Sequence, residues 1–221
     1  MKKTQTTTVA LSLLMMLIGY FAYTARDAYF SVIPMLFLAV PAYFALLKTN
    51  FYKGLLFIVV LSIYATSIEA LSILTSFPYG AFNYNAQLGY KLFDLVPWTV
   101  SFGWVPLVIG SFALSSWIFK GRIYQFIGGV SLLVFSDLMI DPGAVLMRFW
   151  TWTEPGIYYS IPFTNYLGCI FSSTIGGLLL FWMLPPKNLQ KMPFYSTYLS
   201  LIHISEPTRR RGISYAVFCL K

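Results

Sequence analysis

Four carboxylic acids are predicted to lie near one end of a bundle of membrane helices: Glu69, Asp94, Asp137 and Asp141. Charged groups in hydrocarbon are energetically unfavourable, so they are rare there and usually functional. Carboxyl groups in an apolar pocket retain their protons more readily, and one of two close carboxyl groups does so most. A pocket with several acids is therefore able to protonate a substrate with one group and to accept a proton from water with another.

Each polar residue also has a structural interpretation. Asp141 precedes Pro142, a combination typical of a helix end or turn, and Pro142 is expected to end its helix. Asp94 is expected to cap the N-terminus of the helix that follows it. Asn165 would serve equally well as a hydrogen-bond partner of a neighbouring helix. Glu69 is the hardest to explain in this way, because it lies deeper in its predicted helix.

Composition assigns the chain to the membrane proteins. It is 58% hydrophobic and 10% charged, whereas a soluble domain carries about 25% charged residues. We therefore expect an all-α, multi-pass transmembrane helix bundle in the cell membrane, with residues 1–198 forming one domain. The net charge of +8 comes largely from basic residues at the ends of the predicted spans. Membrane orientation explains this charge, so no nucleic-acid partner is expected.

Six segments are apolar over about 20 residues, the length that a membrane-spanning helix needs. They are residues 7–25, 29–47, 51–75, 95–118, 122–140 and 161–184. Eight Lys and Arg residues fall in connections on the N-terminal side and three on the other, which predicts a cytoplasmic N-terminus. The glycine pairs 128–129 and 176–177 lie within spans, where small residues allow helices to pack closely.

Two outer connections, residues 76–94 and 141–160, are rich in aromatic residues, glycine and proline. We expect them to form re-entrant or interfacial segments that cover the acidic pocket. The alternative is an aromatic belt, because Trp, Tyr and Phe gather at membrane interfaces regardless of function.

The C-terminal sequence differs abruptly from the rest. From about Leu199 it reads LSLIHISEPTRRRGISYAVFCLK, which resembles the translation of a sequencing-library adapter. Residues 199–221 are therefore expected to be a non-native tail, with the native C-terminus truncated. His203, the only histidine, falls within this tail, as does Cys219.

Metal and cofactor chemistry is not expected. Residues 1–198 contain no histidine, which excludes a metal site of the His/Cys kind. Prenyl transfer usually needs two Asp-rich motifs that hold magnesium against a diphosphate. Asp137 and Asp141 stand without a second motif of this kind.

Two blocks of the chain resemble the carotenoid biosynthesis protein family of CruF type. The first, residues 69–104, contains FPYGAFNYN, LGYKLF and VPWTVSFGW. The second, residues 137–168, contains DPGAV, WTWTEPGIYYSIP and TNYLG. The chain departs from the family pattern after Glu69, where ALSILT lacks an expected glycine, and at Cys169, where an aromatic residue is expected.

The resemblance implies a membrane-embedded carotenoid hydratase. Such an enzyme adds water to the terminal double bond of an acyclic carotenoid end and gives a tertiary alcohol. Its partners would be a lipophilic carotenoid substrate and membrane lipid. The predicted catalytic residues are Glu69, Asp137 and Asp141, with either aspartate as proton donor and the other two acids holding water.

Aromatic and amide residues complete the predicted site. Asn165 and Tyr79 would orient the acids, while aromatic rings stabilise a carbocation through cation–π attraction. The predicted substrate-binding residues are Tyr79, Asn83, Trp150, Trp152, Tyr159 and Asn165.

Two other functions are compatible with the same residues. One is a small proton-coupled transporter, although acids confined to one end count against it because a proton relay continues across the bilayer. The other is a carotenoid-binding factor with the same pocket and no turnover.

Overall fold

The computed structural model describes residue 10, residues 32–190 and residue 192. Apart from residue 10, the predicted first span (7–25) lies outside the described residues, as does the predicted non-native tail (199–221). Both therefore stay predictions, together with the cytoplasmic N-terminus and the count of six spans.

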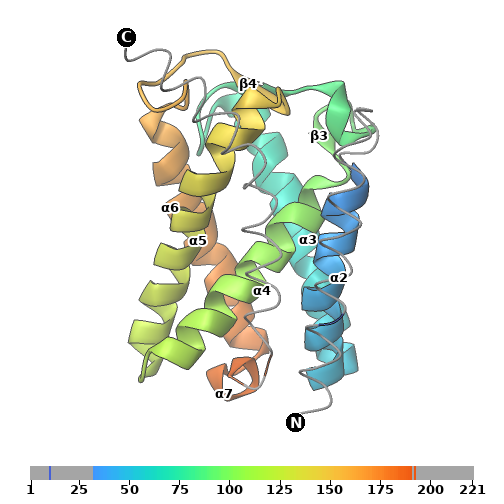
Figure 1. The fold of residues 1–221 in the computed structure, drawn as a ribbon, viewed down its shortest axis with the longest axis vertical. Helices are drawn as coiled ribbons and strands as arrows, with labels where there is room; N and C mark the ends of the chain where they lie inside the picture. The colour runs from blue at the N-terminus through green and yellow to red at the C-terminus, as the bar shows by residue number, and fades with distance from the viewer. Residues whose placement is uncertain (1–9, 11–31, 191, 193–221) are drawn as a thin grey trace.

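The described chain is mostly helical, with short strands gathered at one end of the bundle (Figure 1). The helices are α2 (Val32–Thr49), α3 (Phe51–Thr75), α4 (Val100–Ile118), α5 (Arg122–Leu146), α6 (Phe163–Met183) and the short α7 (Pro186–Leu189). The strands are β1 (Phe82–Tyr84), β2 (Lys91–Leu92), β3 (Val96–Pro97) and β4 (Trp150–Trp152). Four of the described helices, α3 to α6, are long and apolar enough to cross a membrane. The predicted fold class, an all-α membrane bundle, is confirmed.

Most helix positions follow the predicted spans. Residues 51–75 form α3 as predicted, α6 begins and ends within two residues of the predicted 161–184, and α2 occupies most of the predicted second span. The side chain of Asn50 fixes the start of α3 by accepting a hydrogen bond from the Lys53 backbone N–H (3.0 Å). An N-cap of this kind satisfies one of the donors left free at a helix N-terminus.

The fourth span starts later than predicted, at residue 100 rather than 95. The reason is a small hairpin in which β2 pairs antiparallel with β3. Phe93 and Asp94 form its turn, with φ angles of 52° and 59°. Thr99, not Asp94, occupies the N-cap position of α4. The interpretation of Asp94 as the helix cap is therefore wrong.

The fifth span is longer than predicted, because α5 continues through Pro142 to Leu146. Proline has no backbone N–H, so the carbonyl oxygen of Leu138 loses its usual helical donor. The Tyr158 hydroxyl donates a hydrogen bond to that oxygen instead (3.3 Å). The expectation that Pro142 ends the helix is therefore wrong. Asp137 and Asp141 lie in one continuous helix, one turn apart and on a shared face.

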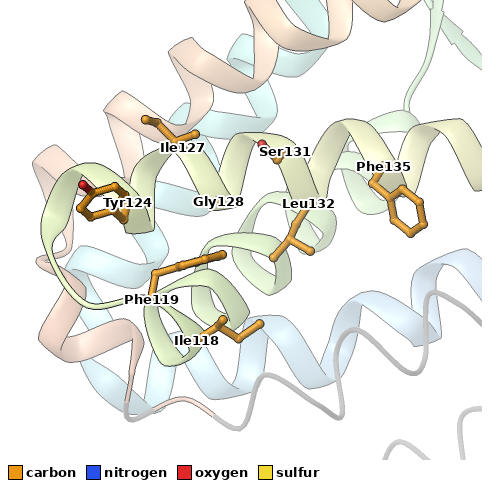
Figure 2. A pocket seen from close by; sticks show the side chains of 8 residues that line it. All are labelled: Ile118, Phe119, Tyr124, Ile127, Gly128, Ser131, Leu132 and Phe135. Atoms are coloured by element: carbon orange, nitrogen blue, oxygen red, sulfur yellow. The ribbon is translucent and has the colours of Figure 1, made fainter.

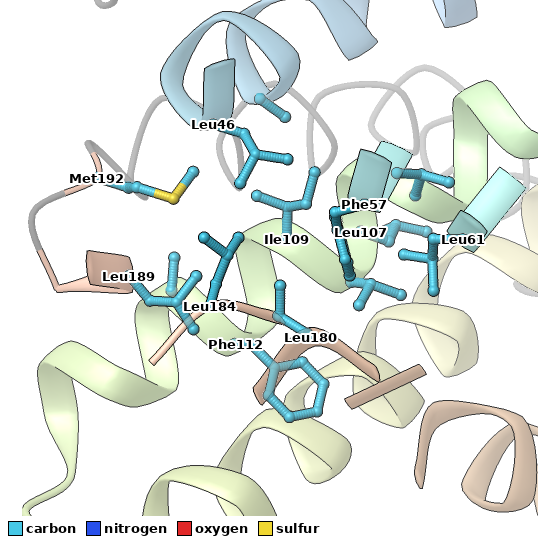
Figure 3. Packing of buried hydrophobic residues seen from close by; sticks show 14 of the residues in the cluster. Leu46, Phe57, Leu61, Leu107, Ile109, Phe112, Leu180, Leu184, Leu189 and Met192 are labelled. Carbon is cyan, nitrogen blue, oxygen red and sulfur yellow. The ribbon is translucent and has the colours of Figure 1, made fainter. Parts of the chain in front are cut away.

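The main core lies between helices α2 to α7 and is filled by aliphatic and aromatic side chains (Figure 3). Phe112 of α4 is fully buried within it. A Cβ atom on Gly129 of α5 would lie 2.4 Å from the Phe112 ring, and one on Gly177 of α6 would lie 2.2 Å from it. The prediction that these glycines permit close helix packing is confirmed.

Gly129→Ala is predicted to destabilise the bundle by about 1–3 kcal/mol, because the added methyl group overpacks a well-filled core. Thermal unfolding of the detergent-solubilised protein measures the effect. Ser131→Ala on the same helix is the control, because Ser131 is exposed and its replacement meets no buried ring. Equal melting temperatures for the two variants would contradict the packing.

Candidate active site

The two aromatic connections meet in a two-stranded antiparallel sheet at one end of the bundle (Figure 1). In its register, Phe82 pairs with Trp152, Asn83 with Thr151 and Tyr84 with Trp150. Alternation along a strand places Phe82, Tyr84, Trp150 and Trp152 on one face and Asn83 and Thr151 on the other. The first face is at least partly buried, whereas Asn83 and Thr151 are exposed.

The buried face of this sheet forms an aromatic cap. Ring centroids lie 5.0 Å apart for Phe82 and Trp152 and 5.9 Å apart for Tyr84 and Trp150. The cap packs against Ile68 of α3 and other buried residues, which makes a second apolar cluster separate from the main core. The two connections therefore form a packed layer over the ends of the helices.

Three of the four predicted acids come together beside this aromatic cap. Glu69 of α3 accepts a hydrogen bond from the Tyr84 hydroxyl (3.1 Å). Asp141 of α5 accepts one from the Asn165 side-chain amide of α6 (2.7 Å). Glu69 interacts electrostatically with Asp137, and Asp141 interacts with both. The three carboxyl groups therefore form one acidic cluster, carried by α3 and α5.

Cys169 and Asn165, one turn apart on α6, connect the members of this cluster. The thiol of Cys169 makes a hydrogen-bonding contact with Asp137. Its sulfur also lies 3.9 Å from the Asn165 side-chain oxygen. Asn165 therefore contacts Asp141 through its nitrogen and Cys169 through its oxygen, which fixes the orientation of its amide.

Burial sets the chemical character of the cluster. Asp141 and Asn165 are only 8% and 6% exposed, while Glu69 and Asp137 are half-buried. Burial raises the pKa of the Tyr84 hydroxyl well above its usual value, and the neighbouring Glu69 carboxyl raises it further. Tyr84 therefore stays protonated and acts as a donor to Glu69.

Other predicted site residues lie nearby without contacting an acid directly. Trp150 and Trp152 belong to the aromatic cap. Tyr79 is buried, packs against Gly168 and makes its side-chain hydrogen bond with Ser172. Tyr84, not Tyr79, donates the described hydrogen bond to Glu69, although Tyr79 also interacts electrostatically with that acid. The role of Tyr79 in orienting an acid stays a prediction.

Three predicted residues lie away from the acidic cluster. Asn83 is exposed on the opposite face of β1 from Tyr84, and Asp94 is exposed in the turn between β2 and β3. Tyr159 is 45% exposed and its ring packs against Tyr158. The structure does not bring these side chains together with the three acids.

Sequence reasoning missed Tyr84 and the contacts of Cys169. The signal for Tyr84 is the spacing of two between Phe82 and Tyr84, which is the period of a β-strand with one buried face. The signal for Cys169 is its position four residues after Asn165, which places both on one face of a helix.

An open apolar groove at the other end of α5 is separate from this site (Figure 2). It has a volume of about 460 Å³ and is lined by residues of α4, α5 and their connection, among them Tyr124, Gly128 and Phe135. Residues two positions apart in a helix are separated by about 200° around the helix axis, so they lie on nearly opposite sides of it. Asp137 therefore faces away from the side of α5 that carries Phe135 and the groove.

The arrangement is that of a helical membrane protein with an acidic cluster packed beside the aromatic cap. Within the described residues, no group of His, Cys, Asp and Glu is arranged to hold a metal ion. A sequence profile described as "Carotenoid biosynthesis protein" matches residues 26–205. The chain therefore belongs to this family, and its function is related to carotenoids.

A curated relative is more specific. Bisanhydrobacterioruberin hydratase of Haloarcula japonica is 31% identical over 126 residues, which are 55% of this chain and 43% of the relative. The chain thus spans less than half the length of that protein. No solved structure matches the chain.

The contact between Asp141 and Asn165 is predicted to be energetically coupled. In a double-mutant cycle of Asp141→Ala and Asn165→Ala, we expect a coupling of about 0.5–3 kcal/mol, because each single change removes the same hydrogen bond. Denaturant unfolding in detergent provides the free energies. The control cycle combines Glu154→Ala, at an exposed acid before α6, with Asn165→Ala. In this cycle we expect the two changes in unfolding free energy to add. Additivity in both cycles would contradict the contact.

Proposed function

We propose that this protein adds water to the terminal double bond of an acyclic carotenoid end and gives a tertiary alcohol. The observation that carries the proposal is the cluster of Glu69, Asp137 and Asp141 beside the aromatic cap. Membership of the carotenoid biosynthesis family and the name of the Haloarcula japonica relative support the substrate class and the reaction. The protein is proposed to act as a multi-pass protein of the cell membrane.

The three acids suit different steps of this reaction. Asp137, which contacts the weakly polar Cys169 thiol, is the proposed proton donor. It transfers its proton to one carbon of the double bond, and the branched carbon becomes a tertiary carbocation. Asp141 and Glu69 each accept a hydrogen bond from a side-chain donor, which suits carboxylates that hold water.

Addition of water completes the cycle without a cofactor. The water oxygen forms the new C–O bond, and its released proton passes to Asp141 or Glu69. Return of that proton to Asp137 restores the starting state, so atoms and charge balance. The rings of Trp150 and Tyr84 lie within the aromatic cap, where cation–π attraction is able to stabilise the carbocation by up to about 2 kcal/mol.

The location of the site also suits an apolar substrate. α3, α5 and α6 are each long enough to span a membrane, and the acidic cluster lies near the ends that carry the sheet. A polyene buried in the bilayer is thereby able to bring its end group to the acids while water enters from the interface.

Asp137→Asn is predicted to reduce hydration roughly 100- to 10,000-fold, the usual effect of losing a general acid. The chain and its variants are expressed in cells that make acyclic carotenoids, and a product heavier by one water is measured by mass spectrometry. Glu69→Gln and Asp141→Asn are expected to reduce the yield as well. The Haloarcula japonica relative serves as the positive control for substrate supply.

Two exposed acids provide matched controls. Asp94→Asn and Glu154→Gln change acids outside the acidic cluster, so their yields should equal that of the unmodified chain. Full activity in all three cluster variants would contradict the proposed chemistry. An unmodified chain that retains carotenoid without converting it would instead identify a carotenoid-binding factor.

A further inference from the structure

The hydroxyl of Tyr166 is buried and has no hydrogen-bond partner among the described residues. A buried hydroxyl without a partner typically costs about 1–3 kcal/mol, and such groups in native structures call for an explanation. Neither the fold nor the proposed roles of the three acids uses this group.

Tyr166 lies directly beside the acidic cluster. It follows Asn165, the donor to Asp141, and it interacts electrostatically with Asp141 and Asp137. Its ring packs against the ring of Tyr158, with centroids 6.2 Å apart. The free hydroxyl is therefore held in place by ring packing, within the electrostatic range of two carboxyl groups.

The position of Tyr166 along α6 fits a side chain that faces the site. Tyr166 and Cys169 are three residues apart and share a helix face, and Cys169 contacts Asp137 of α5. Long aromatic side chains in helices point toward the helix N-terminus. The N-terminal end of α6 is the end of the bundle that carries the sheet (Figure 1), so a side chain with this usual orientation points toward that end.

We propose that the Tyr166 hydroxyl oxygen binds the water molecule that adds to the carotenoid, which makes Tyr166 a further catalytic residue. The inference rests on the proposed function. A water that attacks a carbocation must direct a lone pair at carbon while both of its O–H groups are held. One O–H donates to the carboxylate that later accepts the proton, and the other donates to Tyr166.

Tyr166 acts only after proton transfer in this scheme, and this order gives the test. Asp137 still protonates the double bond when Tyr166 is absent. Without a held water, the carbocation loses a proton and returns to an alkene. In heavy water the recovered carotenoid then carries deuterium although it has gained no hydroxyl group.

The experiment compares Tyr166→Phe with the unmodified chain in isolated membranes that contain the acyclic carotenoid, suspended in heavy water. We expect the hydrated product to fall roughly tenfold, as for the loss of one hydrogen bond, while deuterium in the recovered alkene is unchanged or increased. The melting temperature should be unchanged or higher, because the substitution removes an unpartnered buried polar group. Tyr90→Phe is the control, since Tyr90 is 75% exposed.

The possible failures are distinguishable. Unchanged hydration in Tyr166→Phe would overturn the inference and leave the proposed function intact. A parallel loss of hydration and deuterium exchange, or a lower melting temperature, would also overturn it by assigning Tyr166 a structural role. An unmodified chain that neither exchanges nor hydrates would contradict the proposed function, and the inference with it.

Discussion

The antiparallel pairing of β1 with β4 is the interaction on which the candidate site depends. It joins two connections that are far apart in the sequence, and its register places Tyr84 opposite Trp150. The same alternation buries Tyr84 and directs its hydroxyl to Glu69 of α3. Without this pairing, the aromatic side chains would have no common face, and Glu69 would lose its hydrogen-bond donor.

The acids are held by partners from several segments rather than by their own helices. Glu69 is held from β1 and Asp141 from α6, while α6 also brings Cys169 to Asp137. A buried polar group needs such partners because its desolvation is otherwise uncompensated. The acidic cluster therefore links the strands to α3, α5 and α6, and the position of each acid depends on the packing of the whole bundle.

Hydropathy predicted the helices well because a membrane-spanning helix is defined by length and composition alone. It also predicted three acids of the cluster, since the predicted directions of the spans place Glu69, Asp137 and Asp141 at a common depth. The errors are local. Asp94 lies in the turn before β3. α5 continues through Pro142, and the hydroxyl of Tyr158, from a later connection, donates a hydrogen bond to the carbonyl oxygen of Leu138 that Pro142 leaves without its helical donor.

The strands were not predicted, because each is only two or three residues long and its hydrogen bonds go to a distant segment. No local pattern of such length distinguishes a strand from a loop. Tyr84 was missed for the same reason. Tyr79 and Tyr84 lie in one aromatic connection, and only the pairing of β1 with β4 determines which hydroxyl reaches a carboxyl group.

Cysteine crosslinking across this sheet tests the account most directly. Asn83 and Thr151 are paired and exposed, and opposite residues in antiparallel strands have Cα atoms about 4.5–5.5 Å apart, within the range for a disulfide. Asn83→Cys with Thr151→Cys should crosslink rapidly in membranes and leave carotenoid conversion intact. The pair of Asn83→Cys with Glu154→Cys, three residues further along, should crosslink much more slowly. Equal crosslinking rates in the two double variants would contradict the register on which the site is built.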